Sequence, residues 1–225
     1  HDWLIAGGAE QVVAALHEMY PDAPIYTSYS TKEWREKLDG KVVTGYLQRM
    51  PRLRKYVPFL RAWWFSHLDL SGYDLVISSS GAEAKGIRVP KETKHINYCH
   101  SPTHYYWSRY DSYLADPGFG PFDWLARLGL RILVGPMRKW DYKAAQRPDV
   151  MIANSTHIQA MIKKYYDRDS QVIFPPVAVE MFGDRPGVTP ARRKGFVITG
   201  RQTPYKRIDL AVAACTALNV PLTVY

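Results

Sequence analysis

Residues 196–209 read FVITGRQTPYKRID, and they indicate the class of fold more clearly than any other part of the chain. The first four residues predict a buried strand, and a helical pattern begins at Asp209. Gly200, Arg201 and Lys206 therefore fall where a strand turns into a helix, which is where open α/β sheets bind ligands. The glycine lets backbone approach a ligand closely, and the cations suit phosphate oxygens. We predict a diphosphate site in this turn; the alternative is a basic surface loop with a helix cap at Asp209.

The spacing Gly-Arg-x4-Lys-Arg-x-Asp in this stretch also carries a resemblance. It resembles the start of the donor-binding domain in retaining glycosyltransferases of family 4 (glycosyl transferases group 1), which have the two-Rossmann GT-B fold. The resemblance implies that Arg201 and Lys206 hold the diphosphate of a nucleotide sugar. It further implies that the sugar nucleotide is a substrate, that no cofactor is needed and that the reaction is independent of metal.

A second glycine pair, Gly7-Gly8, precedes a predicted helix near the start of the chain. A flexible loop that leads into the N–H groups of a helix N-terminus is a natural anion site. The pair fits neither the dinucleotide-binding fingerprint nor the Walker A loop, and a plain strand–helix turn remains the alternative. In the family that the chain resembles, such a loop faces the interdomain cleft, which implies that Gly7 and Gly8 contact the donor phosphate or the acceptor.

His100 ends a predicted strand and is followed by Ser101-Pro102. Its neighbours His95, Cys99 and His104 suggest a metal site, but Cys99 and His100 point to opposite faces of a strand, and no second cluster completes a tetrahedral set. We therefore predict no metal, and a hydrogen-bonded structural histidine is the simple interpretation. The run Tyr-Cys-His-Ser-Pro also resembles the acceptor-domain signature of the same glycosyltransferases, which implies that His100 lies beside the donor sugar and orients the reacting centre.

Alternating strands and helices predict an α/β fold with a parallel, Rossmann-like sheet flanked by helices. We expect an acceptor-binding domain over residues 1–178, a linker over 179–193 and the start of a nucleotide-sugar-binding domain over 194–225. The chain begins at His1 and ends at Tyr225 within an expected strand. We therefore expect a truncated first strand and a truncated second Rossmann domain.

Several elements of the first domain can be predicted in detail. A helix over residues 123–147 is expected to break at Pro136, since proline removes a helix hydrogen bond. A helix over 156–166 is expected to be capped by Asn154 or Ser155. Strands are expected at residues 23–28, 42–44, 73–80, 94–100, 149–155 and 172–177.

The composition is that of a globular protein with an anionic partner. Hydrophobic residues make up 46% of the chain and charged residues 23%, and the formal net charge is +9. Such a charge suits nucleic acid, anionic lipid or a nucleotide sugar. No nucleic-acid-reading motif accompanies it, so nucleic acid ranks last. Cys99 and Cys215 are predicted to be core residues in a reducing compartment, which favours a cytoplasmic location.

The segment between Lys41 and Trp64 is basic, aromatic and free of acidic residues. A basic helix with tryptophans is typical of peripheral binding to an anionic membrane, here the inner face of the cytoplasmic membrane. The alternative is an ordinary surface helix whose aromatic side chains pack on its own domain. The expected membrane-contact residues are Arg52, Arg54, Lys55, Arg61, Trp63 and Trp64.

By this resemblance, we expect a retaining hexosyltransferase. It would move a mannose- or glucose-type sugar to a lipid-linked or saccharide acceptor in the synthesis of cell-surface polysaccharide or lipopolysaccharide. A non-catalytic nucleotide-sugar-binding module and a sugar-nucleotide epimerase of the same fold are the alternatives. The family also has a Glu-x7-Glu pair that would lie beyond Tyr225, so we expect the chain by itself to be inactive.

Overall fold

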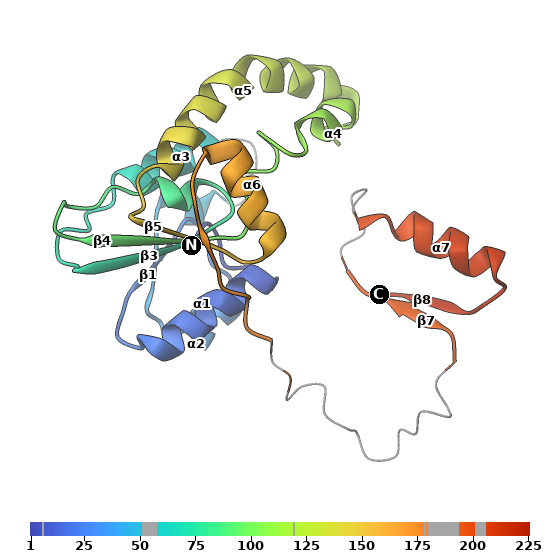
Figure 1. The fold of residues 1–225 in the computed structure, drawn as a ribbon, viewed down its shortest axis with the longest axis horizontal. Coiled ribbons are helices and arrows are strands. Elements are labelled where there is room, and N and C mark those ends of the chain that lie inside the picture. Colours follow the sequence, from blue (N-terminus) through green and yellow to red (C-terminus); the bar gives the residue numbers. More distant parts are fainter. Residues whose placement is uncertain (6, 51–57, 119, 178, 180–193, 201–205) are drawn as a thin grey trace. The chain divides into compact units, whose positions relative to one another are not determined.

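The fold is described from a computed structural model of the chain. The structure describes residues 1–5, 7–50, 58–118, 120–177, 179, 194–200 and 206–225. The chain divides into two compact units, His1–Pro176 and Val177–Tyr225 (Figure 1).

A four-stranded sheet with all strands parallel lies at the centre of the first unit (Figure 1). Its strands, in spatial order, are β3 (Leu75–Ser80), β4 (Lys94–Cys99), β5 (Val150–Ala153) and β6 (Gln171–Val172). Parallel neighbours need a crossover connection, so the alternation of strands and helices along the sequence leads to this arrangement. The predicted α/β class is therefore confirmed, and the sheet is consistent with a Rossmann-like fold.

Two further parallel strands form a smaller sheet in the same unit. They are β1 (Ile25–Thr27) and β2 (Val42–Thr44), and they pair in register from their first residues onward. Leu4 makes an isolated parallel bridge with Ser30, just past the carboxyl end of β1. The first residues of the chain therefore run parallel to β1 and lie beside its carboxyl end.

Helices surround the strands of the first unit. They are α1 (Gly8–Met19), α2 (Lys32–Lys37), α3 (Pro58–Ser66), α4 (Tyr110–Ala115), α5 (Asp123–Ala145) and α6 (Thr156–Tyr166), with short 3-10 turns η1 (Tyr46–Arg49), η3 (Glu83–Gly86) and η4 (Gly120–Phe122). Over the part of the chain that the structure describes, no helix combines the length and the hydropathy needed to cross a bilayer.

Three clusters of buried apolar side chains stabilise the first unit, each side chain by about 1.5–3 kcal/mol when fully buried. The cluster around β4, β5 and α6 contains Cys99, Ala145, Met151, Ala153, Ile158, Ile162 and Tyr166. The cluster around α1 and α2 contains Leu4, Val13, Trp34 and Leu38. The cluster beneath α3 contains Phe65, Leu70, Ala84 and Ile87. Cys99 is a core residue as predicted, whereas Cys215 is half-buried.

The short turn η3 is held from three directions. Arg61 of α3, Asp141 of α5 and the carboxylate of Asp2 each bond to it. The ring of Trp140 on α5 also lies where a side chain at Gly86 would be, so that position has room only for glycine. Four residues that form a single turn thus join α3, α5 and the N-terminal residues.

The predicted cap of α6 is confirmed for one of its two candidates. The hydroxyl of Ser155 accepts a hydrogen bond from the N–H of Ile158 at 3.3 Å, which satisfies one of the unpaired groups at the helix start. Asn154 has a different role, since its side-chain amide donates to the carbonyl of His100 at 3.1 Å. It thereby ties the end of β5 to the end of β4.

The predicted break at Pro136 is wrong, because α5 continues through this residue from Asp123 to Ala145. Proline cannot donate to the carbonyl four residues earlier, which here belongs to Ile132. Both Ile132 and Pro136 are exposed, so water can bond the carbonyl that loses its helix donor. The helix therefore tolerates the proline on its solvent side.

The second unit contains β7 (Phe196–Ile198), α7 (Ile208–Ala217) and β8 (Leu222–Val224), with the two strands parallel. The prediction that β7 is buried is wrong, since Phe196 and Val197 are 61% and 64% exposed. Two strands and one helix cannot cover both faces of a sheet, so apolar side chains remain at the surface.

The turn that leads into α7 uses unusual backbone conformations. Gly200 has φ +149°, which side-chain-bearing residues rarely adopt. Arg207 is left-handed at the start of α7, and its guanidinium bonds the carboxylate of Asp209 at 3.0 Å. Asp209 therefore lies in the first turn of the helix and pairs with a cation instead of capping the helix end.

Candidate functional site

His100 directly follows β4, at the carboxyl end of the parallel sheet. Its backbone N–H donates to the carbonyl of Ser80 at 2.9 Å, which aligns it with the end of β3. Its Nε2 is 2.8 Å from the hydroxyl of Ser79, and its ring centre lies 5.3 Å from that of Tyr98. The imidazole is thus held in a defined orientation at the edge where open α/β sheets bind ligands.

The imidazole of His100 is neutral at neutral pH. Burial lowers its pKa to about 4, although the Asp2 carboxylate opposes this shift. A neutral imidazole has one N–H donor and one acceptor nitrogen. Since Nε2 meets Ser79, the ring can address a ligand through Nδ1 by a hydrogen bond that carries no net charge.

The loop that follows β3 forms an anion site that the chain itself fills. The carboxylate of Asp2 accepts the backbone N–H groups of Gly81 at 2.8 Å, Ala82 at 2.9 Å and Ala84 at 2.7 Å. Successive N–H groups of this kind bind anions. The serines that end β3 are a signal for a polar site at this edge, but nothing in the pattern points to Asp2 as the group that fills the loop after β3.

The Gly7-Gly8 loop leads into α1, with Gly7 at the N-cap and Gly8 as the first helical residue. A Cβ on Gly7 would lie 2.8 Å from Oε2 of Glu10, so a larger residue here would require the Glu10 side chain to move. The buried Glu10 carboxylate also accepts from the N–H of Ile5 at 3.4 Å, and its charge is favourable near the positive end of the helix. Any phosphate at this loop would therefore have to bind beside a resident carboxylate.

Two of the predicted phosphate-binding residues belong to the second unit. Arg201 lies outside the described residues, while Lys206 is described and exposed just before α7. Gly7, Gly8 and His100 all belong to the first unit. Within that unit, His100 follows β4 and the glycine pair follows the bridge of Leu4 at the end of β1, so these residues all lie beyond the carboxyl ends of parallel strands.

The residues that suggested a metal site have separate partners. His95 bonds the hydroxyl of Ser78 at 2.8 Å, and His104 bonds that of Tyr113 at 3.1 Å. Burial raises the pKa of the Cys99 thiol to about 12, which keeps it protonated. Across the described residues, no three His, Cys, Asp or Glu side chains lie together in a way that could hold a metal ion.

The burial of His95 predicts that the folded chain loses stability in acid. Burial lowers its pKa from 6.5 to about 4, so the unfolded chain takes up a proton at a higher pH than the folded chain. The free energy of unfolding should therefore fall as the pH drops from about 6.5 to 4, by up to about 3 kcal/mol from this residue. Urea unfolding of the wild-type chain and of His95→Gln at several pH values would test this. Equal pH dependence in the two proteins would contradict the prediction.

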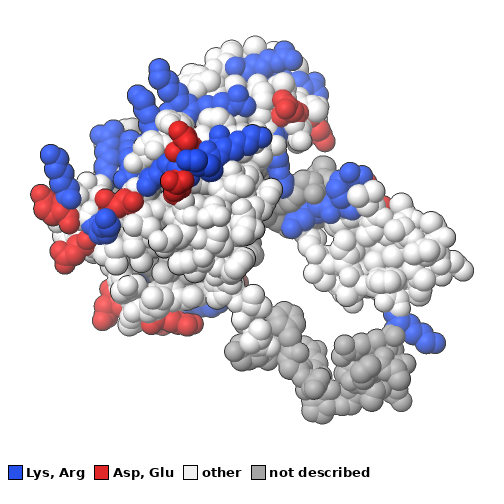
Figure 2. Space-filling model, in the orientation of Figure 1, with Lys and Arg blue, Asp and Glu red and all other residues white. Residues whose placement is uncertain are grey.

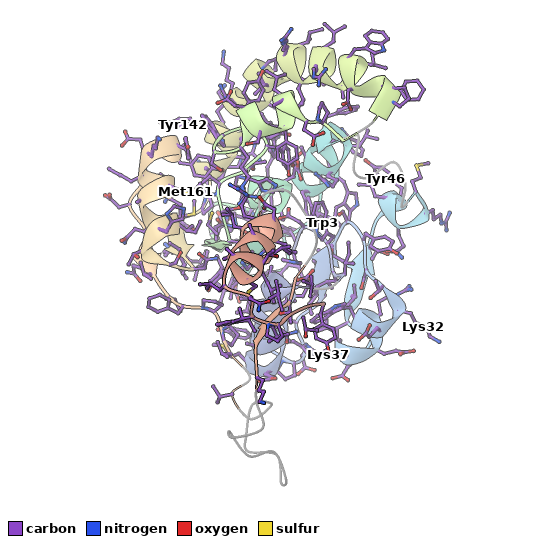
Figure 3. All side chains as sticks on the ribbon, turned by 90° about the vertical axis from the view of Figure 1, so that its right-hand side faces the viewer. Trp3, Lys32, Lys37, Tyr46, Tyr142 and Met161 are labelled. Carbon is purple, nitrogen blue, oxygen red and sulfur yellow. The ribbon has the colours of Figure 1, made fainter. Side chains whose placement is uncertain are left out.

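The predicted membrane-contact segment is partly corrected by the structure. Arg52, Arg54 and Lys55 lie outside the described residues. Arg61 does not face solvent, since it is buried and lies 2.9 Å from the Glu83 carboxylate. Its guanidinium lies over the ring of Trp3 at 4.6 Å, and Trp3 is labelled in Figure 3. The carboxylate offsets the cost of removing the cation from water, which explains why a basic residue here is internal.

The two tryptophans of this segment differ in environment. Trp63 is 54% exposed and stacks on His67 with ring centres 4.4 Å apart. Trp64 packs on the cluster beneath α3, and its ring occupies the space next to Gly45 where a side chain would otherwise be. Among the described members of the predicted set, only Trp63 therefore presents a large surface to solvent.

A buried ionic network between α5, η3 and α6 was not anticipated from the sequence. Lys85 Nζ lies 2.7 Å from Asp141 Oδ1, and both side chains are fully buried. The Asp141 carboxylate also accepts from Thr103 at 2.8 Å, Trp107 at 2.8 Å and Tyr166 at 2.7 Å. Burial lowers the pKa of Lys85, but the Asp141 carboxylate outweighs this and the net shift is upward. Lys85 is therefore charged at neutral pH, and its contact with Asp141 has a structural role.

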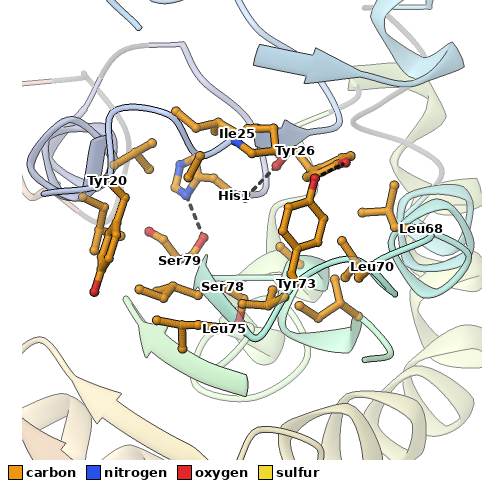
Figure 4. A pocket seen from close by; sticks show the side chains of 18 of the residues that line it. His1, Tyr20, Ile25, Tyr26, Leu68, Leu70, Tyr73, Leu75, Ser78 and Ser79 are labelled. Carbon is orange, nitrogen blue, oxygen red and sulfur yellow. Dashed lines mark hydrogen bonds between the residues drawn. The ribbon is translucent and has the colours of Figure 1, made fainter. Parts of the chain in front are cut away.

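A cavity of about 240 Å³ lies in the first unit between α1, β1 and β3 (Figure 4). Its walls are mainly apolar and include Leu16, Ile25, Phe65 and Ile77. Apolar walls do not suit a diphosphate, and neither His100 nor the glycine pair contributes to them. We therefore do not assign this cavity to the donor.

The chain matches no protein-family model, and comparison with the curated proteins gives no significant match. The features of the described residues that bear on function are three. They are a neutral, oriented His100 at the sheet edge, a glycine loop at the start of α1, and Lys206 just before α7.

Proposed function

We propose that this chain forms the acceptor-binding part, and the beginning of the donor-binding part, of a retaining glycosyltransferase with the GT-B fold. The whole enzyme would transfer a hexose of the mannose or glucose type from a nucleotide diphosphate sugar to a lipid-linked or saccharide acceptor, in the synthesis of cell-surface polysaccharide, and this chain by itself is expected to be inactive. The observation that carries this proposal is the neutral imidazole of His100, fixed by Ser79 at the carboxyl end of an all-parallel sheet.

His100 has the role of orienting the sugar. Its Nε2 is bound by Ser79 and its backbone carbonyl by Asn154, so two neighbouring strand ends fix the residue. A polar group held in this way can meet a sugar hydroxyl in one geometry, which reduces the entropy lost on reaching the transition state. Because the ring is neutral, it can accept or donate a hydrogen bond without attracting the diphosphate to itself.

Arg201 and Lys206 have the role of binding the diphosphate. Departure of the nucleotide diphosphate leaves negative charge on the leaving group, which positive groups stabilise in the transition state. The positive end of α7 lies next to Lys206, and the φ of Gly200 lets backbone approach a ligand. The Gly7-Gly8 loop adds N–H groups at the start of α1, where Glu10 limits the space for phosphate. No metal is required for these roles.

The proposed setting is the cytoplasmic face of a membrane, to which the protein binds peripherally. A lipid-linked acceptor is presented at such a surface, and the net charge of +9 favours anionic lipid. Nucleic acid is not a proposed partner.

The test uses the full-length gene product that contains this chain. It is incubated with a panel of nucleotide diphosphate sugars, including GDP-mannose and UDP-glucose, and with saccharide and lipid-linked acceptors. The anomeric configuration of any product is determined by NMR. We expect transfer with retention, and we expect His100→Ala to lower kcat by about 10²-fold, since a misplaced reacting centre has effects of this size.

A matched control is available in His157→Ala, because His157 is an exposed histidine on α6. We expect this variant to retain wild-type kcat. Transfer with inversion would overturn the proposed retaining reaction. Full activity in His100→Ala would overturn the proposed role of His100. Release of an epimerised sugar nucleotide without acceptor would support the epimerase, and tight binding without turnover would support a binding module.

A further inference from the structure

The first half of α5 carries an exposed apolar face that the described part of the first unit does not cover. Trp124, Leu125, Leu128 and Ile132 are each between 48% and 63% exposed, and Phe122 just before the helix is equally exposed. At 3.6 residues per turn, the four helical residues fall within about 100° of one another. They therefore form one continuous stripe and are not scattered singly over the surface.

The other half of α5 is firmly anchored. Asp141, Ala144 and Ala145 are buried, and the ring of Trp140 packs on Gly86 of η3. Arg127 donates to the last carbonyls of α4, which fixes that short helix against α5. Figure 1 shows that α4 and the first half of α5 stand away from the sheet, while the second half lies near it. The apolar stripe thus belongs to a helix whose second half is packed on the first unit.

Cations accompany the apolar stripe along the helix. Between residues 122 and 143 there are five cations and two acids, and one of the acids, Asp141, is buried against Lys85. Arg131, Lys139 and Lys143 are exposed. Figure 2 shows Lys and Arg side chains gathered over α5 in that view. The outer face of α5 therefore combines apolar and aromatic side chains with a positive charge.

We propose that the outer face of α5 binds the surface of an anionic lipid bilayer. The helix would lie along the membrane plane, with Trp124, Leu128 and Ile132 among the acyl chains and Arg131 and Lys139 at the headgroups. An interfacial helix needs this pairing of a hydrophobic stripe with lysine and arginine. The exposed cations favour anionic lipid over an apolar protein surface, in which they would lose their hydration.

This surface differs from the segment between Arg52 and Trp64, and it does not depend on the proposed transferase activity. In that segment Arg61 is buried and Trp64 is packed. In α5, by contrast, the apolar side chains and the cations are exposed together on one element.

The experiment is co-sedimentation of the chain with unilamellar vesicles. One set contains phosphatidylcholine alone and the other contains equal parts phosphatidylcholine and phosphatidylglycerol. We expect binding to the anionic set, and the variant Trp124→Ser/Leu128→Ser/Ile132→Ser should raise the apparent Kd at least about tenfold. Because these side chains are exposed, the variant should keep the wild-type melting temperature within a few degrees.

Met19→Ser is the matched control, since Met19 is a comparably exposed apolar residue at the end of another helix, α1. We expect it to change the apparent Kd less than twofold. Trp63→Ser tests the segment that the sequence suggested. The proposal is overturned if the α5 variant binds like the wild type, if Trp63→Ser releases the protein while the α5 variant does not, or if both vesicle sets bind equally. Loss of self-association in the α5 variant, with vesicle binding unchanged, would equally overturn it in favour of a second copy as the occupant.

Discussion

Replacing Asp141 with alanine is expected to lower the free energy of unfolding by about 3–5 kcal/mol, the range found when one partner of a buried ion pair is removed. The reason is that the ammonium of Lys85 would remain buried without a counter-charge. The side chains of Thr103, Trp107 and Tyr166 would also lose the acceptor to which they donate. Urea unfolding at neutral pH measures the change.

Two further variants separate the charge from the hydrogen bonds. Asp141→Asn keeps the shape but removes the charge, so it should be less damaging than Asp141→Ala. The double variant Lys85→Met/Asp141→Leu removes both charges, and it should recover much of the loss, because buried pairs can often be replaced by apolar residues at little cost. A double variant as unstable as the sum of its two single changes would contradict the interpretation.

A surface ion pair serves as the matched control. Asp169 lies 3.3 Å from Lys163, and both side chains are largely exposed. Asp169→Ala should therefore leave the free energy of unfolding almost unchanged, because water screens an exposed pair. If Asp141→Ala had an equally small effect, the network around Lys85 would not be the stabilising contact that its burial indicates.

An apolar strand joined to the amino group of His1 is expected to raise the melting temperature by roughly 5–10 °C, equivalent to a few kcal/mol for a chain of this size. The cavity between β1 and β3 is the reason. His1 lies at one end of this cavity (Figure 4). Its amine donates to the carbonyl of Tyr26 at 2.9 Å, and its ring Nδ1 lies 2.7 Å from the carbonyl of Ser79. The parallel bridge of Leu4 shows the direction that such a strand would take.

A strand in this position would connect the two sheets of the first unit. Its side chains would fill the apolar cavity, and each fully buried Val or Ile would contribute about 1.5–3 kcal/mol, partly offset by backbone ordering of about 1–2 kcal/mol per residue. It would also replace a buried amine whose pKa is lowered by burial to about 6. Joining a strand to His1 would thus turn this amine into an amide, which does not take up a proton.

Thermal unfolding of two extended chains tests this expectation. One carries a run of five or six Val and Ile residues before His1, and the other carries Gly and Ser over the same length. The glycine–serine extension also replaces the amine but buries no apolar surface, so it should raise the melting temperature much less than the Val and Ile extension. Equal melting temperatures for the two extensions would show that the cavity does not accept a strand.

Local patterns predicted the position of β4, and the sheet edge at which His100 lies followed from the α/β class. The alternation of polar and apolar residues ahead of His100 is typical of a strand. The carboxyl edge of a parallel sheet is where such folds bind ligands. Ser155 was likewise predictable as one of two caps, because a hydroxyl before a helical run satisfies the first N–H groups. These features depend on residues that are close together in the sequence.

Features that depend on distant partners could not be predicted in the same way. Arg61 was expected at the surface, and only the fold shows that Glu83 meets it in the interior. Asp2 fills the loop after β3 although it precedes Gly81 by 79 residues, and no spacing rule connects the two positions. Pro136 would end an isolated helix, but the exposure of its side of α5 lets the helix continue.

The convergence of α3, α5 and the first residues on η3 has a consequence for how the first unit unfolds. Opening any one of these three elements removes a partner from the same four-residue turn, and the other two then lose part of their support. Elements that depend on one another in this way do not melt separately. The unit should therefore behave as one cooperative block, in which damage at any of the three elements is felt by the other two.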